Sequence, residues 1–235
     1  MPQIEWLGSL NYKQGRSGIK PIAIVNHVTA GSFPGCLHWL TNKESQASAH
    51  YLVTREGRII QMVKDEDTAW HAGVVNKPNW LIYKGENPNL YTIGIEHEGS
   101  PDQQLTEVQY LATLWLHQQL IKWWGILIDS NHIIGHYRID SVNRPNCPGP
   151  LFPWDRLFAD LKGDVTLPEE WQLEIMQEAE ELGLIEKDRH KPDEPADKWF
   201  VLALALKLAK KLDDIRTVNQ DMKSIAGITS KYVAK

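Results

Sequence analysis

The chain has 235 residues, of which 42% are hydrophobic and 23% are charged, and its formal net charge is −5. This composition is typical of a soluble globular protein with one full domain and room for a small second one. The negative net charge argues against nucleic acid as the main partner, because phosphate binding needs a basic surface. No run approaches the roughly 18 apolar residues of a membrane span.

The start of the chain, Met1 to Gly8, has no basic region followed by an apolar stretch, so we expect no signal peptide and a chain made in the cytoplasm. The two cysteines, Cys36 and Cys147, do not make a disulfide framework.

The first third of the chain predicts a strand, a short helix and a hairpin. The β-branched apolar run 21–28 predicts a buried strand with His27 at its end, where side chains face a cleft. Taken alone, His27 is better explained as a buried core histidine. A loop and a short helix over 36–43 follow. Residues 49–63 predict a β-hairpin in which Gly57 supplies the positive φ of the turn.

Residues 91–99 predict the next strand, and alternation places Glu96 and Glu98 on one of its faces. Two carboxylates on a strand otherwise built of Ile and Gly fit a solvated edge strand. They fit equally well a general base that faces a metal-bound water. The strand alone does not decide between these two interpretations.

The rest of the first domain predicts two helices and a last strand. Thr106 begins a capping-box pattern for a helix that runs to Trp124 and stops at Gly125. A strand over 131–135 and a short helix over 153–161 follow. Composition shifts near Gly163, and we expect a catalytic domain over 1–162 and a small helical module over 163–235.

The stretch from His132 to Cys147 suggests a metal site. It contains a second histidine, His136, between these two residues. Imidazole and thiolate are common zinc ligands, and a catalytic zinc takes three protein ligands and leaves the fourth position to water. This stretch supplies two ligands, and His27 is the natural candidate for the third. Spacing alone does not choose between His132 and His136.

Several motifs recur in one order along residues 20–160: Val25-Asn-His27, Ser48-Ala-His50-Tyr-Leu-Val-Thr-Arg-Glu-Gly57, Ala69-Trp-His71-Ala-Gly73, Ile93-Gly-Ile-Glu96-His-Glu98-Gly99 and Gly135-His136 with Cys147-Pro-Gly149. In these motifs the chain resembles the zinc-dependent N-acetylmuramoyl-L-alanine amidases. That family includes phage lysozyme-type amidases, cell-wall recycling amidases and peptidoglycan recognition proteins. The resemblance implies an α/β fold, with a mixed central β-sheet flanked by helices.

The resemblance also implies a site. The zinc ligands would be His27, His136 and Cys147, with water as the fourth ligand, and Glu96 would be the catalytic carboxylate. The substrate would be peptidoglycan, cut at the amide between the lactyl group of N-acetylmuramic acid and L-alanine. His50 and His71 occupy family motif positions and are expected to contact substrate or to support the site.

One position departs from the family pattern. Many members carry a Lys two residues before the last ligand, where it stabilises the oxyanion, and this chain has Pro145 there. Arg144 or Arg138 is expected to substitute, unless the metal alone polarises the carbonyl.

The layout resembles a phage or prophage endolysin, held in the cytoplasm until the membrane is breached, with a C-terminal module for wall binding or dimerisation. A cytoplasmic recycling amidase is the alternative enzyme. Two further alternatives are a non-catalytic recognition module and a structural zinc site completed by His132 or Cys36.

Overall fold

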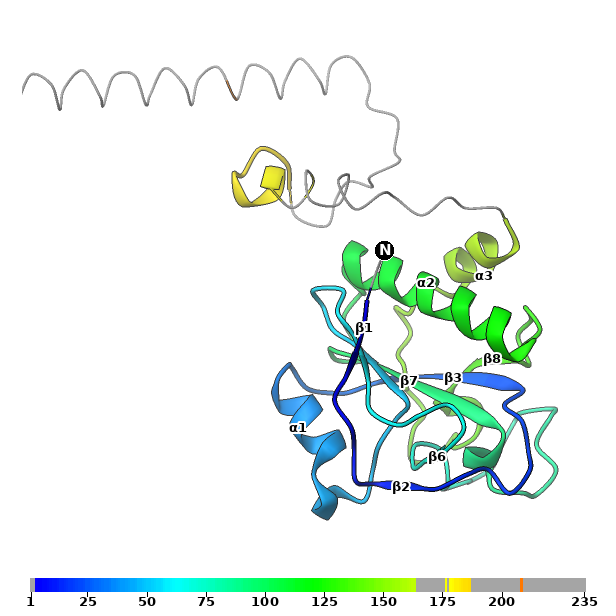
Figure 1. The fold of residues 1–235 in the computed structure, drawn as a ribbon. Helices are drawn as coiled ribbons and strands as arrows, with labels where there is room; N and C mark the ends of the chain where they lie inside the picture. Colours follow the sequence, from blue (N-terminus) through cyan, green and yellow to red (C-terminus); the bar gives the residue numbers. More distant parts are fainter. Residues whose placement is uncertain (1–2, 164–175, 177, 187–207, 209–235) are drawn as a thin grey trace, which may run out of the picture. The chain divides into compact units, whose positions relative to one another are not determined.

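The computed structural model describes residues 3–163, 176, 178–186 and 208 (Figure 1). The chain divides at Leu167 into two units, and the first contains the fold described here. Its strands are β1 (Ile4–Trp6), β2 (Tyr12–Lys13), β3 (Ala23–Val28), β4 (Tyr51–Val53), β5 (Ile59–Gln61), β6 (Thr68–Ala69), β7 (Thr92–His97) and β8 (Ile133–Gly135). Its α-helices are α1 (Gly35–Thr41), α2 (Glu107–Trp124) and α3 (Trp154–Lys162), and its 3-10 helices are η1 (Lys43–Ser45), η2 (Pro88–Leu90) and η3 (His136–Arg138).

Six strands form one mixed sheet in the order β1-β5-β4-β7-β3-β8. β7 is parallel to both β4 and β3, and β8 is parallel to β3. β4 and β5 form the predicted antiparallel hairpin, in which Gly57 has a φ of 81°. β2 and β6 pair separately. The α/β fold with a mixed, helix-flanked sheet is therefore confirmed.

The two faces of the sheet bury different residues of the same strands, as alternation requires. One face packs against α2, which lies beside α3 over the sheet (Figure 1). This face includes Ile24 of β3 and the pair Ile93 and Ile95 of β7. On the opposite face, Ala23 and Val25 pack against the loop that carries Trp80 and against Ile134 and Ile139, and α1 covers Leu52 and Ile60.

The long helix α2 begins and ends as its sequence predicts. The hydroxyl of Thr106 accepts a hydrogen bond from the Gln109 backbone N–H at 3.1 Å, which satisfies one of the free donors of the first turn. Gly125 follows the last residue with a φ of 69°, the left-handed conformation that ends many helices.

Strands β3, β7 and β8 run in the same direction, so their carboxyl ends meet at one edge of the sheet. In open α/β sheets, ligands bind in the crevice outside these ends. His27 lies near the end of β3, Glu96 near the end of β7, and His136 directly after β8. Three segments that are far apart in the sequence therefore deliver their side chains to one place.

The predicted C-terminal helical module lies mostly outside the described residues. Within 178–186, the Leu182 N–H donates to the Glu178 carbonyl at 2.9 Å, and Gly183 has a φ of 61°, in agreement with a helix that ends at this glycine. The boundary at residue 163 and the role of the module stay predictions. In the part of the chain that the structure describes, no helix combines the length and apolarity needed to cross a membrane.

Candidate metal centre and active site

Three side chains meet at the carboxyl edge of the sheet. The Nδ1 atom of His27 lies 3.1 Å from Nδ1 of His136 and 3.9 Å from Sγ of Cys147. All three residues are buried, and their ligand atoms lie within 4.8 Å of one another. In a tetrahedral zinc site, nitrogen and sulfur ligands lie about 3.3–3.6 Å apart, given metal–ligand bonds of about 2.0–2.3 Å. The donor set and its spacing therefore fit a metal ion.

The surroundings favour protonation states that are suited to binding a cation. Burial lowers the pKa of His136 to about 4 and that of His27 well below its usual value, so both rings are neutral and each has a lone pair. Burial, followed by the nearby Glu96, raises the pKa of the Cys147 thiol to about 12. Without a cation this thiol keeps its proton, so metal binding must release it.

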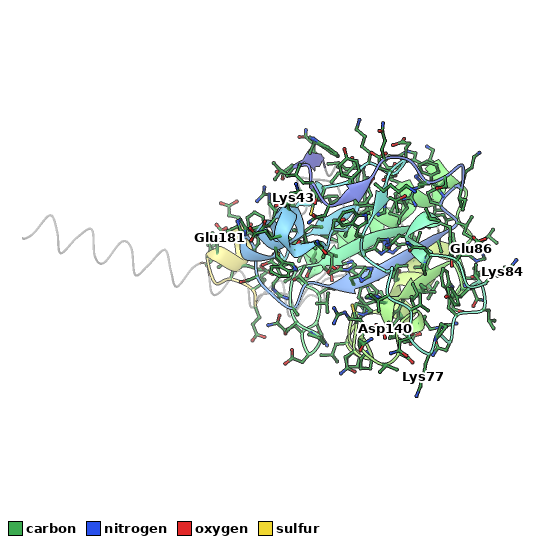
Figure 2. All side chains as sticks on the ribbon, turned by 90° about the horizontal axis from the view of Figure 1, so that it is seen from below. Lys43, Lys77, Lys84, Glu86, Asp140 and Glu181 are labelled. Atoms are coloured by element: carbon green, nitrogen blue, oxygen red, sulfur yellow. The ribbon has the colours of Figure 1, made fainter. Side chains whose placement is uncertain are left out.

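The loop that carries His136 and Cys147 is fixed by its own hydrogen bonds. The Tyr137 N–H donates to the Cys147 carbonyl at 3.1 Å, which brings the two ends of the loop together. Asp140, labelled in Figure 2, is nearly fully buried, and its Oδ1 accepts from the Asn143 backbone N–H at 2.8 Å. These hydrogen bonds within the loop hold His136 and Cys147 in position.

Glu96 is the carboxylate that faces this centre. It is the register partner of His27 on the neighbouring parallel strand, and it lines the same cleft. Its buried Oε2 atom has no hydrogen-bond partner among the described residues. Burial raises the pKa of Glu96 to about 8, and the positive charge of Arg144 opposes this shift. Glu96 thus has the free oxygen that proton transfer requires.

Glu98, two residues later, has a structural task. Its Oε1 accepts from the Phe33 backbone N–H and its Oε2 from the Arg55 backbone N–H, both at 2.8 Å. Both oxygens of Glu98 are therefore engaged by the backbone of neighbouring loops. The sequence alone did not distinguish Glu96 from Glu98. These contacts do, because both oxygens of Glu98 accept hydrogen bonds and Oε2 of Glu96 accepts none among the described residues.

Of the two histidines that the sequence offered as ligands, only His136 lies in the cluster with His27 and Cys147. Nδ1 of His132 donates to Asp129 Oδ1 at 2.8 Å, and His132 is not part of the cluster of ligands. Cys36 is buried in α1 and lines the cleft, but it is not a member either. Within the described residues the cluster has three members and no fourth His, Cys, Asp or Glu, which disfavours a closed, structural site.

The two histidines expected near the substrate have different positions. His71 lines the cleft, and its Nδ1 lies 3.0 Å from Nε2 of His27. His50 is fully buried, does not line the cleft, and accepts at Nδ1 from the Gly94 N–H at 3.0 Å. These contacts favour support of the site over substrate contact as the role of His50, because its ring bonds the backbone of β7 and does not line the cleft.

The two arginines considered as substitutes for the missing Lys also differ. Arg144 is exposed and lines the cleft. Arg138 donates from Nε to the Asn79 carbonyl at 3.1 Å and does not line the cleft. Arg138 thus lies outside the cleft lining, and Arg144 is the one Lys or Arg side chain among the described residues of that lining.

The cleft has a volume of about 1050 Å³. Sequence reasoning missed Trp39 and included Trp70 only as part of the motif over 69–73. Trp39 of α1 is 60% exposed and Trp70 is 38% exposed, and both line the cleft. No periodic sequence pattern marks an exposed Trp beside a metal site. The pattern Asp140-Ser-Val-Asn143, in contrast, predicts a turn, and such a turn orders the loop that carries His136 and Cys147. Of the loop 76–89, Asn89 lines the cleft, whereas Lys84 and Glu86 are exposed at the edge of the fold (Figure 2).

Comparison with known proteins gives a family. Residues 17–150, more than half of the chain, match the family described as N-acetylmuramoyl-L-alanine amidase. The chain is 39% identical over 120 residues to 1,6-anhydro-N-acetylmuramyl-L-alanine amidase AmpD of Haemophilus influenzae. The aligned segment is 51% of this chain and 61% of that relative, so the chain spans about three fifths of the relative's length.

Two solved structures are similar to the fold. A selenomethionine derivative of AmpD superposes with a TM-score of 0.57 and 26% identity, over 68% of this chain and 94% of that one. AmiD of Escherichia coli, in complex with the substrate anhydro-N-acetylmuramic acid-L-Ala-D-γ-Glu-L-Lys, gives a TM-score of 0.53 and 27% identity over 74% of each chain.

Proposed function

Because the chain belongs to the N-acetylmuramoyl-L-alanine amidase family, we propose that it hydrolyses the amide between the lactyl group of N-acetylmuramic acid and L-alanine, with zinc as its metal. The convergence of His27, His136 and Cys147 with Glu96 in one cleft supports this proposal most strongly. Two imidazoles, one thiolate and an open fourth position form a ligand set of catalytic zinc.

Zinc bound there would polarise the scissile carbonyl and make an attacking water available at neutral pH. Glu96 accepts the proton of that water and passes it to the amine that leaves. The free Oε2 atom of Glu96 suits this task, and the nearby cations, Arg144 and the metal, favour its ionised form over the protonated form that burial alone produces.

Arg144 is proposed to take the place of the family's Lys. A guanidinium is a cation that presents several N–H donors. It can donate to the oxygen that becomes negative during attack, or to a carboxylate of the stem peptide. Both roles place its charge next to the developing or permanent negative charge of the substrate.

The presence of Cys147 among the three ligands disfavours a non-catalytic recognition module, since the binders of the family have lost the metal. The same open site disfavours a purely structural zinc. Hydrolysis is therefore the function that the side chains of the cleft support best.

The form of the substrate follows from a separate observation. The relative at 39% identity is named for 1,6-anhydro-N-acetylmuramyl-L-alanine, and the AmiD structure holds an anhydromuropeptide. We therefore propose free anhydromuropeptides as substrates, the assignment of a recycling amidase. An endolysin that cuts intact walls is the second candidate, and the match of this fold to endolysin structures of 19–22% identity concerns the fold alone.

Mass spectrometry of the products distinguishes the two candidates. The protein is incubated with anhydromuropeptide and, in parallel, with purified polymeric peptidoglycan. A free peptide that begins with L-alanine, released from the first substrate much faster, supports a recycling amidase. Faster release from the polymer supports an endolysin, and sugar and peptide that stay joined in both would refute the amidase.

We also propose that the C-terminal module, residues 163–235, binds walls or mediates dimerisation. Truncation after residue 162 should weaken sedimentation of the protein with intact walls or change its oligomeric state. If neither changes, the module has another role.

A further inference from the structure

We propose that His71 and Thr92 form a hydrogen-bond relay that fixes the tautomer of His27, so that the lone pair of its Nδ1 faces the metal. His71 is thus a positioning residue for a metal ligand. The inference rests on the metal site of the proposed function. It concerns how tightly that site binds zinc in the absence of substrate.

The relay begins at Thr92, which is fully buried in β7 and lies outside the cleft lining. A hydroxyl has a single proton to donate. The Thr92 hydroxyl lies 2.8 Å from the Pro88 carbonyl, which can only accept, so its proton points there. The oxygen of Thr92 is therefore available as an acceptor on its other side.

His71 occupies that side, with Nε2 3.2 Å from the Thr92 oxygen. Because the hydroxyl proton is already used, Nε2 of His71 must be the donor. A neutral imidazole carries one proton, on one of its two nitrogens. Nδ1 of His71 therefore presents a lone pair.

That lone pair meets Nε2 of His27 at 3.0 Å. A hydrogen bond at this distance requires the proton to be on Nε2 of His27, which leaves Nδ1 of His27 unprotonated. The same Nδ1 is the atom that lies 3.1 Å from His136 Nδ1 and 3.9 Å from Cys147 Sγ. The relay thus removes the proton from the atom that faces the other two ligands.

The ring of His71 is held in place by its neighbours. A Cβ atom on Gly94 would lie 2.5 Å from Cγ of His71, so only glycine at this position of β7 lets the ring approach. The side chain of Asn89 accepts from the backbone N–H groups of His71 at 3.2 Å and Ala72 at 2.7 Å. Both contacts fix the orientation on which the relay depends.

The test compares two substitutions of His71 by zinc affinity, measured in competition with a chromophoric chelator and without substrate. His71→Asn places an oxygen near the position of Nδ1 and can still accept from His27. His71→Phe keeps the ring volume and removes the acceptor. We expect His71→Phe to bind zinc about 10–100-fold more weakly, the range seen when partners of metal ligands are lost. His71→Asn should stay much closer to wild type. A space-filling role predicts the reverse order.

A second pair of substitutions changes Thr92, a residue outside the cleft lining. Thr92→Val removes the end of the relay, and Thr92→Ser restores its hydroxyl. We expect Thr92→Val to weaken zinc binding and to shift the visible spectrum of the cobalt-substituted protein, with Thr92→Ser close to wild type. Thr113→Val is the matched control, because Thr113 is equally buried and its hydroxyl bonds a helical carbonyl, that of Gln109. It should leave both readings unchanged.

Equal zinc affinities for wild type, His71→Phe and Thr92→Val would overturn the relay while leaving the metal site intact. Weaker binding by Thr113→Val to the same degree as by Thr92→Val would also overturn it, since loss of any buried hydroxyl would then explain the effect. A wild-type protein that binds no zinc would overturn both the relay and the proposed metal site.

Discussion

His27 and Glu96 are register partners on the adjacent parallel strands β3 and β7. A proposed metal ligand and the proposed proton acceptor are therefore set side by side by backbone hydrogen bonds of the sheet, not by a flexible loop. Strand register is strongly specified where both faces are buried. The relative position of the two groups should thus be insensitive to changes at the surface.

Exchange of the two carboxylates on β7 for amides should have different effects. Glu96→Gln removes the proton acceptor and should lower kcat by about 10²–10⁴-fold while zinc content is kept. Glu98→Gln leaves one acceptor oxygen for two backbone N–H groups and should lower the free energy of unfolding by about 1–3 kcal/mol. Steady-state kinetics and chemical denaturation measure the two effects. Full turnover by Glu96→Gln would exclude it as the acceptor.

Arg144→Ala should lower kcat by about 10²-fold or more if its guanidinium stabilises the oxyanion. Arg144→Lys should recover part of the rate, because it restores the charge. Arg138→Ala is the control, since Arg138 donates to the Asn79 and Ser130 carbonyls outside the cleft lining. The measurement is kcat of each variant on a muropeptide substrate. If Arg144→Ala keeps the wild-type rate, no arginine replaces the family's Lys.

His117 should make the fold sensitive to acid. It is fully buried, and burial lowers its pKa to about 4 from the usual 6.5. As pH falls from 6.5 toward 4, the unfolded chain takes up a proton that the folded chain does not, so stability falls by up to about 1.4 kcal/mol per pH unit from this residue. His117→Gln should therefore flatten the acid side of the stability curve, measured by urea unfolding at each pH. Identical slopes for the two proteins would contradict this assignment.

Gly149 should be essential for the position of the Cys147 loop. It has a φ of 124°, and a Cβ atom there would lie 2.2 Å from the Pro101 carbonyl oxygen. Gly85 also has a positive φ, 95°, but nothing lies within 4 Å of its Cβ position. Gly85→Ala should cost about 1–2 kcal/mol of stability from backbone strain alone. Gly149→Ala should cost more and should also weaken zinc binding. Equal losses would show that the clash is relieved without moving the loop.

The sequence predicted the architecture well because its signals are local. The apolar run that ends at His27, the turn at Gly57 and the cap at Thr106 each depend on a few neighbouring residues, and all three are confirmed. The choice of His136 over His132 as a ligand came only from the resemblance, because spacing alone left both open, and His136 is the one that lies with His27 and Cys147.

Other features of the site depend on contacts between distant segments. The bond between His27 and His71 joins residues 44 positions apart, and its direction depends on a hydroxyl of β7. The sequence placed His50 and His71 in the same class, and only the packing around Gly94 distinguishes them. The engagement of Glu98 by two loop N–H groups likewise has no local signal.

The most direct test of the central claim is a zinc titration of the metal-free protein followed by product analysis. Metal is removed with a chelator, zinc is returned in steps, and release of L-alanine peptides from anhydromuropeptide is measured by mass spectrometry. We predict no release without metal, activity that rises with bound zinc up to one ion per chain, and neither binding nor activity in Cys147→Ser. Full activity in the metal-free protein, or zinc-dependent activity in Cys147→Ser equal to wild type, would contradict the assignment of this centre.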